Sequence, residues 1–220
     1  NVLGAGIWLA GPDNGGSTTA NEMPEGYIGS LYCYRTSAEG VVVSGFHDAV
    51  IKSVNIGSSK YTGLLCERIT GEASCTGEIL HAHVYGGDYI GIDVQGPMHF
   101  GECIAESNAH IGCLVDYKNN SASGPTWFTT LQVYSNCSDN DIGVNSYRQI
   151  ALAEPNCVVG KLLASGAGST ANPIYVVDVT ANRVQCHGIN IVGNSDTYGI
   201  RNAGNYCQFD GVINGCGRGL

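Results

Sequence analysis

Hydrophobic and polar residues alternate with a period of two in short stretches along much of this chain. In the segment 80–85, the apolar residues Leu80, Ala82 and Val84 alternate with polar or aromatic residues. Since successive side chains of a strand point to opposite faces, this pattern predicts strands with one buried and one exposed face. The stretches carry no helical stripe of apolar residues, so the sequence predicts an all-β protein.

Many of these stretches begin with a glycine followed by an aliphatic residue or a cysteine. The repeated glycines are Gly6, Gly63, Gly91, Gly112, Gly143, Gly199 and Gly219; Gly29 opens a related stretch, and 174–177 fills the longest interval. Recurrence at intervals of roughly 20 to 50 residues is typical of solenoids. The pattern therefore predicts one solenoid domain over residues 1–220, with about 8–9 coils of short strands joined by glycine-rich bends.

Strand parity predicts which residues face the core. The expected buried residues are Leu80, Ala82, Val84, Cys103, Ala105, Leu131, Val133, Ile189 and Ile191, with Val158, Gly160 and Leu162 inward around an outward Lys161. Counting back from the repeated glycines aligns His81 with Glu102 and Tyr85 with Glu106 on neighbouring strands. The next strand is expected to need a one-residue bulge, which places Gln132 near Glu102.

Composition narrows the classes of function. Only 13% of residues are charged, 32 are glycine and 6 are proline, which suits tightly turning β structure. The net charge of −9 opposes binding to a nucleic-acid backbone. No apolar run is long enough to suggest membrane insertion. A neutral or mixed-charge ligand such as a glycan fits this composition better.

The ends of the chain and its cysteines give two further expectations. The chain has no initiating Met and no polar cap on its terminal coils, so we expect a segment of a longer polypeptide that forms a homotrimer or depends on flanking domains. The 10 cysteines are irregularly spaced, and several fall at apolar positions of strands: Cys33, Cys66, Cys103, Cys113 and Cys137. We expect mostly reduced, buried thiols, with one or more disulfides as the alternative.

The repeated coils, with their polar and aromatic outward positions, resemble the right-handed, single-stranded parallel β-helix of the pectin-lyase-like group. Within that group, the segments Asn140-Asp141-Ile142-Gly143-Val144 and Asp196-Thr197-Tyr198-Gly199-Ile200 resemble a coil signature of bacteriophage tailspikes. The resemblance implies a trimeric spike in the virion tail, or an extracellular protein. It also implies binding, and often cleavage, of bacterial surface polysaccharide.

The candidate catalytic residues are His81, His83, Tyr85, Glu102 and Glu106, which should meet on one outward face. Histidine can act as a base and a phenol as an acid, while carboxylates hold or neutralise a sugar. The two glutamates lie four residues apart on one strand, about 13 Å at 3.3 Å per residue, which is wide for a pair of hydrolytic carboxylates. Solvated residues or a subunit interface explain the same pattern without catalysis.

Other side chains are candidates for binding the substrate. These are Trp127, Tyr134 and Gln132, together with Asp93 and Asp116 from an expected outward carboxylate column that begins at Glu67. Trp127 is expected to stack on a sugar ring from the segment 119–127. His81 and His83 have the spacing of metal ligands on a strand, and Glu102 could be a third ligand. No Cys or Asp spacing strengthens this reading, so we expect no metal and no cofactor.

Together these observations lead to one main hypothesis and two alternatives. The main hypothesis is a tailspike-like protein that binds bacterial surface polysaccharide and acts either as a plain receptor-binding segment or as a depolymerase. The first alternative is a non-catalytic structural or adhesive trunk. The second is a free-standing polysaccharide lyase, and the sequence does not decide between lyase and glycoside hydrolase chemistry.

Overall fold

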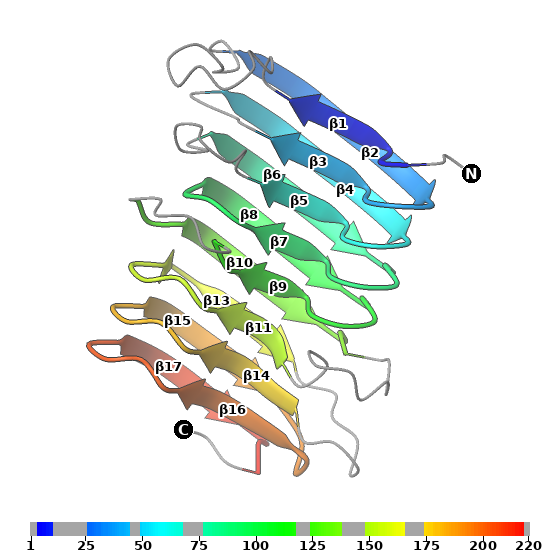
Figure 1. The fold of residues 1–220 in the computed structure, drawn as a ribbon. Coiled ribbons are helices and arrows are strands. Elements are labelled where there is room, and N and C mark those ends of the chain that lie inside the picture. Colours follow the sequence, from blue (N-terminus) through cyan, green and yellow to red (C-terminus); the bar gives the residue numbers. More distant parts are fainter. Residues whose placement is uncertain are drawn as a thin grey trace.

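The computed structural model describes residues 4–10, 26–44, 49–67, 77–117, 124–137, 148–165 and 174–217. Throughout these ranges the regular structure is β-strand, and the paired strands are all parallel. The strands stack along one axis as a solenoid (Figure 1). The all-β solenoid predicted from the alternating pattern is therefore confirmed. None of the described residues forms a helix that could span a membrane.

The solenoid has two parallel sheets. The eight-stranded sheet contains β1 (Ile7–Ala10), β3 (Val41–Ser44), β5 (Leu64–Glu67), β7 (Ile92–Val94), β9 (Cys113–Val115), β11 (Arg148–Leu152), β14 (Ile174–Val179) and β16 (Thr197–Asn202). The nine-stranded sheet contains β2 (Tyr27–Thr36), β4 (Val50–Ser59), β6 (Glu78–Tyr85), β8 (His99–Glu106), β10 (Trp127–Tyr134), β12 (Val158–Val159), β13 (Leu162–Ser165), β15 (Gln185–Val192) and β17 (Gln208–Asn214). Inward residues of both sheets form one core between them.

Close contact between coils explains the repeated glycines. A Cβ on Gly40 would lie 2.6 Å from the Gly63 carbonyl oxygen, and a Cβ on Gly63 would lie 2.8 Å from that of Gly91. A Cβ on Gly91 would lie 2.6 Å from the oxygen of Gly112. Each of these glycines comes directly before a strand of the eight-stranded sheet, and only a residue without a Cβ fits there.

Some glycines were assigned to the repeat incorrectly. In the next coil of the stack, the residue that lies beside Gly6 is Gly40, because Ile7 donates its backbone N–H to the Gly40 carbonyl at 3.0 Å. Gly29 lies within β2, in the other sheet. Gly112 is followed in the column by Gln149, whose carbonyl accepts the Gly112 N–H at 2.9 Å. Gly143 and Gly219 lie outside the described residues.

A bend in the long strands overturns part of the predicted core. Ile79 is fully buried, whereas Leu80 is 41% exposed and Ala82 is again buried. Two consecutive residues thus face outward between two inward ones, and β8 repeats this arrangement at Gly101. A Cβ on Gly101 would lie 2.3 Å from the Leu80 carbonyl oxygen, so glycine lets the strands stay paired at the bend.

The same bend occurs farther along the solenoid, where it changes which of the predicted residues face the core. Val159 is buried in place of Val158, and Gly160 is exposed beside Lys161. The other predicted core positions are confirmed as buried: Ala82, Val84, Cys103, Ala105, Leu131, Val133, Leu162, Ile189 and Ile191. Strict alternation therefore holds on each side of the bend but not across it.

This bend predicts effects of very different size for substitutions at two adjacent aliphatic residues. Replacing Ile79 with alanine should cost about 3 kcal/mol of unfolding free energy, because it leaves a cavity in the core. Leu80→Ala should cost under about 0.5 kcal/mol, since Leu80 is a surface residue. Denaturant titration of both variants measures the difference. A larger loss for Leu80→Ala than for Ile79→Ala would contradict the bend and indicate strict alternation through β6.

Buried asparagines connect consecutive coils at the turn after the nine-stranded sheet. Asn108 and Asn136 are 0% and 1% exposed. The Asn136 side-chain oxygen accepts the Asn108 backbone N–H at 2.9 Å, and its amide nitrogen donates to the Ala105 and Tyr134 carbonyls at 3.0 and 2.9 Å. These bonds satisfy turn backbone that would otherwise be buried without partners.

The described cysteines form no disulfide with one another. Seven are buried and Cys207 and Cys216 are partly buried, while Cys75 lies outside the described residues. Burial raises the pKa of Cys137 and of Cys186 to about 12. Within the described ranges, the expectation of reduced, core-packed thiols is confirmed, and such thiols are unreactive because they stay protonated.

Candidate functional site

The nine-stranded sheet presents columns of outward side chains between the bend and the following turn. The strand register places His81 beside Glu102, and Tyr85 beside Glu106, as predicted. Gln132 and Tyr134 continue onto the next strand, β10. We call the set His81, His83, Tyr85, Glu102, Glu106, Gln132 and Tyr134 the outward patch. It spans β6, β8 and β10 in the middle of the stack (Figure 1).

Glu102 joins side chains from all three strands. One of its carboxylate oxygens lies 3.2 Å from His81 Nδ1, and the other accepts a 2.6 Å hydrogen bond from Gln132 Nε2. The Tyr134 hydroxyl then donates to Gln132 Oε1 at 2.8 Å. The predicted proximity of Gln132 and Glu102 is confirmed, but the predicted bulge is wrong. Thr130 pairs with Glu102 in an unbroken register, and Gln132 reaches Glu102 diagonally.

A second group of contacts lies nearer the turn. His83 Nε2 is 3.2 Å from Glu106 Oε1, and the rings of His83 and Tyr85 lie 5.1 Å apart. A hydrogen bond to Tyr32 raises the pKa of Tyr85. Burial, followed by the negative charges of Glu102 and Glu106, raises the pKa of Tyr134. Both phenols therefore stay protonated at neutral pH and can donate hydrogen bonds.

The outward patch is open to a ligand. The side chains of His81 and Glu102 are 35% and 46% exposed, and those of His83 and Glu106 are 31% and 42% exposed. The backbones of Glu102 and Glu106 stand about 13 Å apart along β8 at 3.3 Å per residue, and each carboxylate contacts a different histidine. This separation exceeds the range for paired hydrolytic carboxylates. The geometry favours hydrogen bonding to a ligand over two-carboxylate hydrolysis.

The expected carboxylate column on the other sheet is wrong. Asp93 pairs with Leu65 and Leu114, so it does not share a column with Glu67. Asp93 is 2% exposed and accepts a 2.9 Å hydrogen bond from Gln95. Asp116 is partly buried beyond the end of β9. Neither aspartate lies in the outward patch.

Trp127 lies on the other side of the bend from the outward patch. It is the first residue of β10 and is 48% exposed. Its ring lies 6.4 Å from that of His99, which forms a 2.8 Å pair with Glu78. Trp127 is therefore an exposed, strand-held aromatic side chain, whereas most of the segment 119–127 lies outside the described residues.

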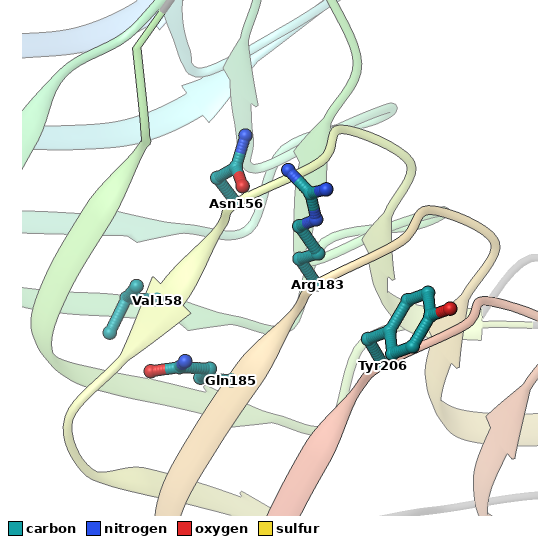
Figure 2. A pocket seen from close by; sticks show the side chains of 5 residues that line it. All are labelled: Asn156, Val158, Arg183, Gln185 and Tyr206. Atoms are coloured by element: carbon teal, nitrogen blue, oxygen red, sulfur yellow. The ribbon is translucent and has the colours of Figure 1, made fainter.

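Two features were missed from the sequence. The first is an open groove of about 440 Å³ lined by Asn156, Val158, Arg183, Gln185 and Tyr206 (Figure 2). The second is an ion-pair cluster in which the buried Asp178 accepts 2.7 Å bonds from Arg148 and Arg201. Arg201 also lies 4.7 Å over the ring of Tyr175. Neither feature has a spacing signal, because each depends on the register between coils.

The described residues contain no group of three or more His, Cys, Asp or Glu side chains arranged to hold a metal ion. No protein-family model, curated protein or solved structure matches the chain.

Proposed function

We propose that this protein binds bacterial surface polysaccharide through the outward patch, as a segment of a tailspike-like receptor-binding protein. The observation that carries the proposal is the hydrogen-bonded network from His81 through Glu102 and Gln132 to Tyr134. It holds an imidazole, a carboxylate, an amide and a phenol in fixed positions on a rigid sheet. Sugars are recognised by polar groups of this kind beside aromatic surfaces, and preorganised groups lose little entropy on binding.

The wider architecture in this proposal is a right-handed parallel β-helix of about 8–9 coils within a homotrimer. Parallel strands support it, since each coil returns to the same sheet beside its predecessor. A linear polysaccharide would cross successive strands along the stack. The inter-strand spacing of about 4.8 Å is comparable to one sugar residue of an extended chain. The protein would work in the virion tail or another extracellular setting.

Cleavage of the bound chain is a second candidate function. The pairing of His83 with Glu106 orients an imidazole beside the ring of Tyr85, whose phenol is protonated. An imidazole can remove a proton next to a uronate carboxyl while a phenol protonates the departing glycosidic oxygen. This is polysaccharide lyase chemistry, and it would leave an unsaturated sugar at the new chain end. Incubation with polysaccharides and ultraviolet detection of that product tests it.

Two substitutions in the outward patch test the binding proposal. Glu102→Gln and His83→Ala should each lower glycan affinity at least tenfold, about 1.4 kcal/mol, because Glu102 is the centre of the network and His83 is the imidazole of the neighbouring pair with Glu106. Both side chains are about one-third to one-half exposed, so the melting temperature should barely change. Calorimetric titration with capsular and lipopolysaccharide glycans measures the affinity.

Light scattering on the same variants separates binding from assembly. If the outward patch instead joins subunits of a structural or adhesive trunk, the substitutions should weaken oligomerisation and leave glycan affinity intact. Lys60→Gln serves as a control, since its 3.9 Å pair with Asp88 lies on the exposed surface and includes no residue of the outward patch. Unchanged affinity in both patch variants would contradict the proposal.

A further inference from the structure

The groove near the C-terminal end of the stack lies outside the outward patch. Asn156, Arg183 and Tyr206 come from the turns before β12, β15 and β17, and Val158 and Gln185 come from the first residues of β12 and β15. Figure 2 shows Asn156 and Arg183 side by side at one end, with Val158 and Gln185 together along the strands. The groove of about 440 Å³ therefore combines a cation, two amides and an aromatic ring.

Arg183 is a cation available to a ligand. Within the described ranges, no acidic side chain forms an ion pair with it, whereas Arg148 and Arg201 both pair with Asp178. The Arg183 side chain is exposed and lines the open groove. A guanidinium has a planar fork of N–H donors that matches a carboxylate in two-point contact. The groove thus offers a binding position for one negative group.

Three residues that line the groove have a left-handed backbone conformation, which is unusual for two of them. Asn156, Arg183 and Tyr206 all adopt left-handed conformations, with φ of 64°, 59° and 59°. Glycine and asparagine accept this conformation readily, but arginine and tyrosine do so at a cost in free energy. The same conformation recurs outside the groove, at Arg35, Ser58, Ser107, Ser135 and Cys137, and it persists where the surrounding structure fixes it. The turn geometry alone does not call for a large cationic or aromatic residue here.

The groove also continues an exposed aromatic surface. Trp127 of β10 pairs with Val158 of β12, and Val158 pairs with Gln185 of β15. Trp127 is 48% exposed and Tyr206 is 87% exposed. The two aromatic side chains therefore stand at opposite ends of a path that crosses neighbouring strands, with Arg183 near its middle. Aromatic rings at both ends suit the apolar faces of sugars.

We propose that this groove binds an acidic sugar residue, namely a carboxylate-bearing unit within a polysaccharide whose other units are neutral. The inference rests on the proposed glycan-binding function and adds the chemical class of the ligand. The net charge of −9 disfavours a dense polyanion. One exposed arginine can instead hold a single carboxylate per repeat, while Trp127 and Tyr206 contact the neighbouring sugar rings.

The backbone conformation provides a clean set of variants. Arg183→Gly removes the guanidinium and relieves the left-handed strain, so folding should be preserved while affinity for an acidic glycan falls at least tenfold. Tyr206→Asn removes the ring at a position where asparagine is tolerated, and it should also weaken binding. Arg35→Gly is the matched control, because Arg35 has a φ of 58° near the end of β2, toward the opposite end of the chain. That control should bind as the unmodified protein does.

The probes are hyaluronan, alginate and polygalacturonate oligosaccharides, each compared with its carboxyl-reduced, neutral counterpart. Calorimetry should give tighter binding to at least one acidic probe than to its neutral form. Hyaluronan should bind more tightly than the two polyuronates, because its carboxylates alternate with neutral units. Arg183→Gly should remove the difference between acidic and neutral forms. Equal binding of acidic and neutral forms overturns this inference and leaves glycan binding standing. Binding only to neutral bacterial glycans also overturns the inference of an acidic ligand and leaves glycan binding standing. Absence of all glycan binding overturns both proposals.

Discussion

Alanine in place of Gly91 should destabilise the solenoid by about 3 kcal/mol or more, since the added methyl group has no space. Its Cβ would lie 2.6 Å from the Gly112 carbonyl oxygen and 2.7 Å from the Asn108 side-chain nitrogen. The Gly112 oxygen already accepts the Ile92 backbone N–H at 2.9 Å, so the coils cannot separate without losing that bond. The loss is measured by denaturant unfolding followed by circular dichroism.

Gly29→Ala is the matched control for this prediction. Gly29 lies in β2, and beyond its chain neighbours no atom of the described residues comes within 4 Å of the place that a Cβ would take. Alanine there should therefore change stability by under about 0.5 kcal/mol. Both variants add the same single methyl group to the same kind of residue. Equal stability of the two proteins would show that the glycines do not set the contact between coils.

Asn136→Ala should cost about 3 to 5 kcal/mol, because several buried groups lose their partners together. The Ala105 and Tyr134 carbonyls would lose the amide donor, and the Asn108 backbone N–H would lose its acceptor. Water cannot easily replace these bonds at a position that is 1% exposed. Thermal and denaturant unfolding of the variant provide the measurement.

An exposed asparagine on the same sheet supplies the comparison. Asn190 faces outward from β15, and Asn190→Ala should change the unfolding free energy by under about 0.5 kcal/mol. Comparable losses at positions 136 and 190 would mean that the buried side-chain bonds between coils contribute little. The stability of the solenoid would then come from apolar packing alone.

Alternation predicted much of the fold because each strand has one buried face. It identified the inward residues Ala82 and Val84, and it aligned His81 with Glu102 across β6 and β8. It failed at Leu80, where the strand bends and two successive residues face outward. The same bend recurs at the corresponding positions of β4, β8 and β10, so it belongs to the stack of coils, and a pattern within a single strand does not contain this information.

The candidate site was predictable only in part for a related reason. His81 and Glu102 lie on regular strands, so counting residues was enough to bring them together, whereas Gln132 was placed near Glu102 by a bulge that the strands do not have. Arg183 and Tyr206 come from turns, and their meeting depends on how successive coils are offset. Asp93 was expected at the surface from strand parity, but tertiary packing leaves it 2% exposed.

The central claim is that the outward patch binds polysaccharide, and a crystal structure with a bound bacterial oligosaccharide tests it most directly. We expect sugar hydroxyls within hydrogen-bonding distance of Glu102 and Gln132, with the sugar chain crossing β6, β8 and β10. A sugar bound only elsewhere, or an outward patch covered by another subunit in the assembled protein, would contradict the claim.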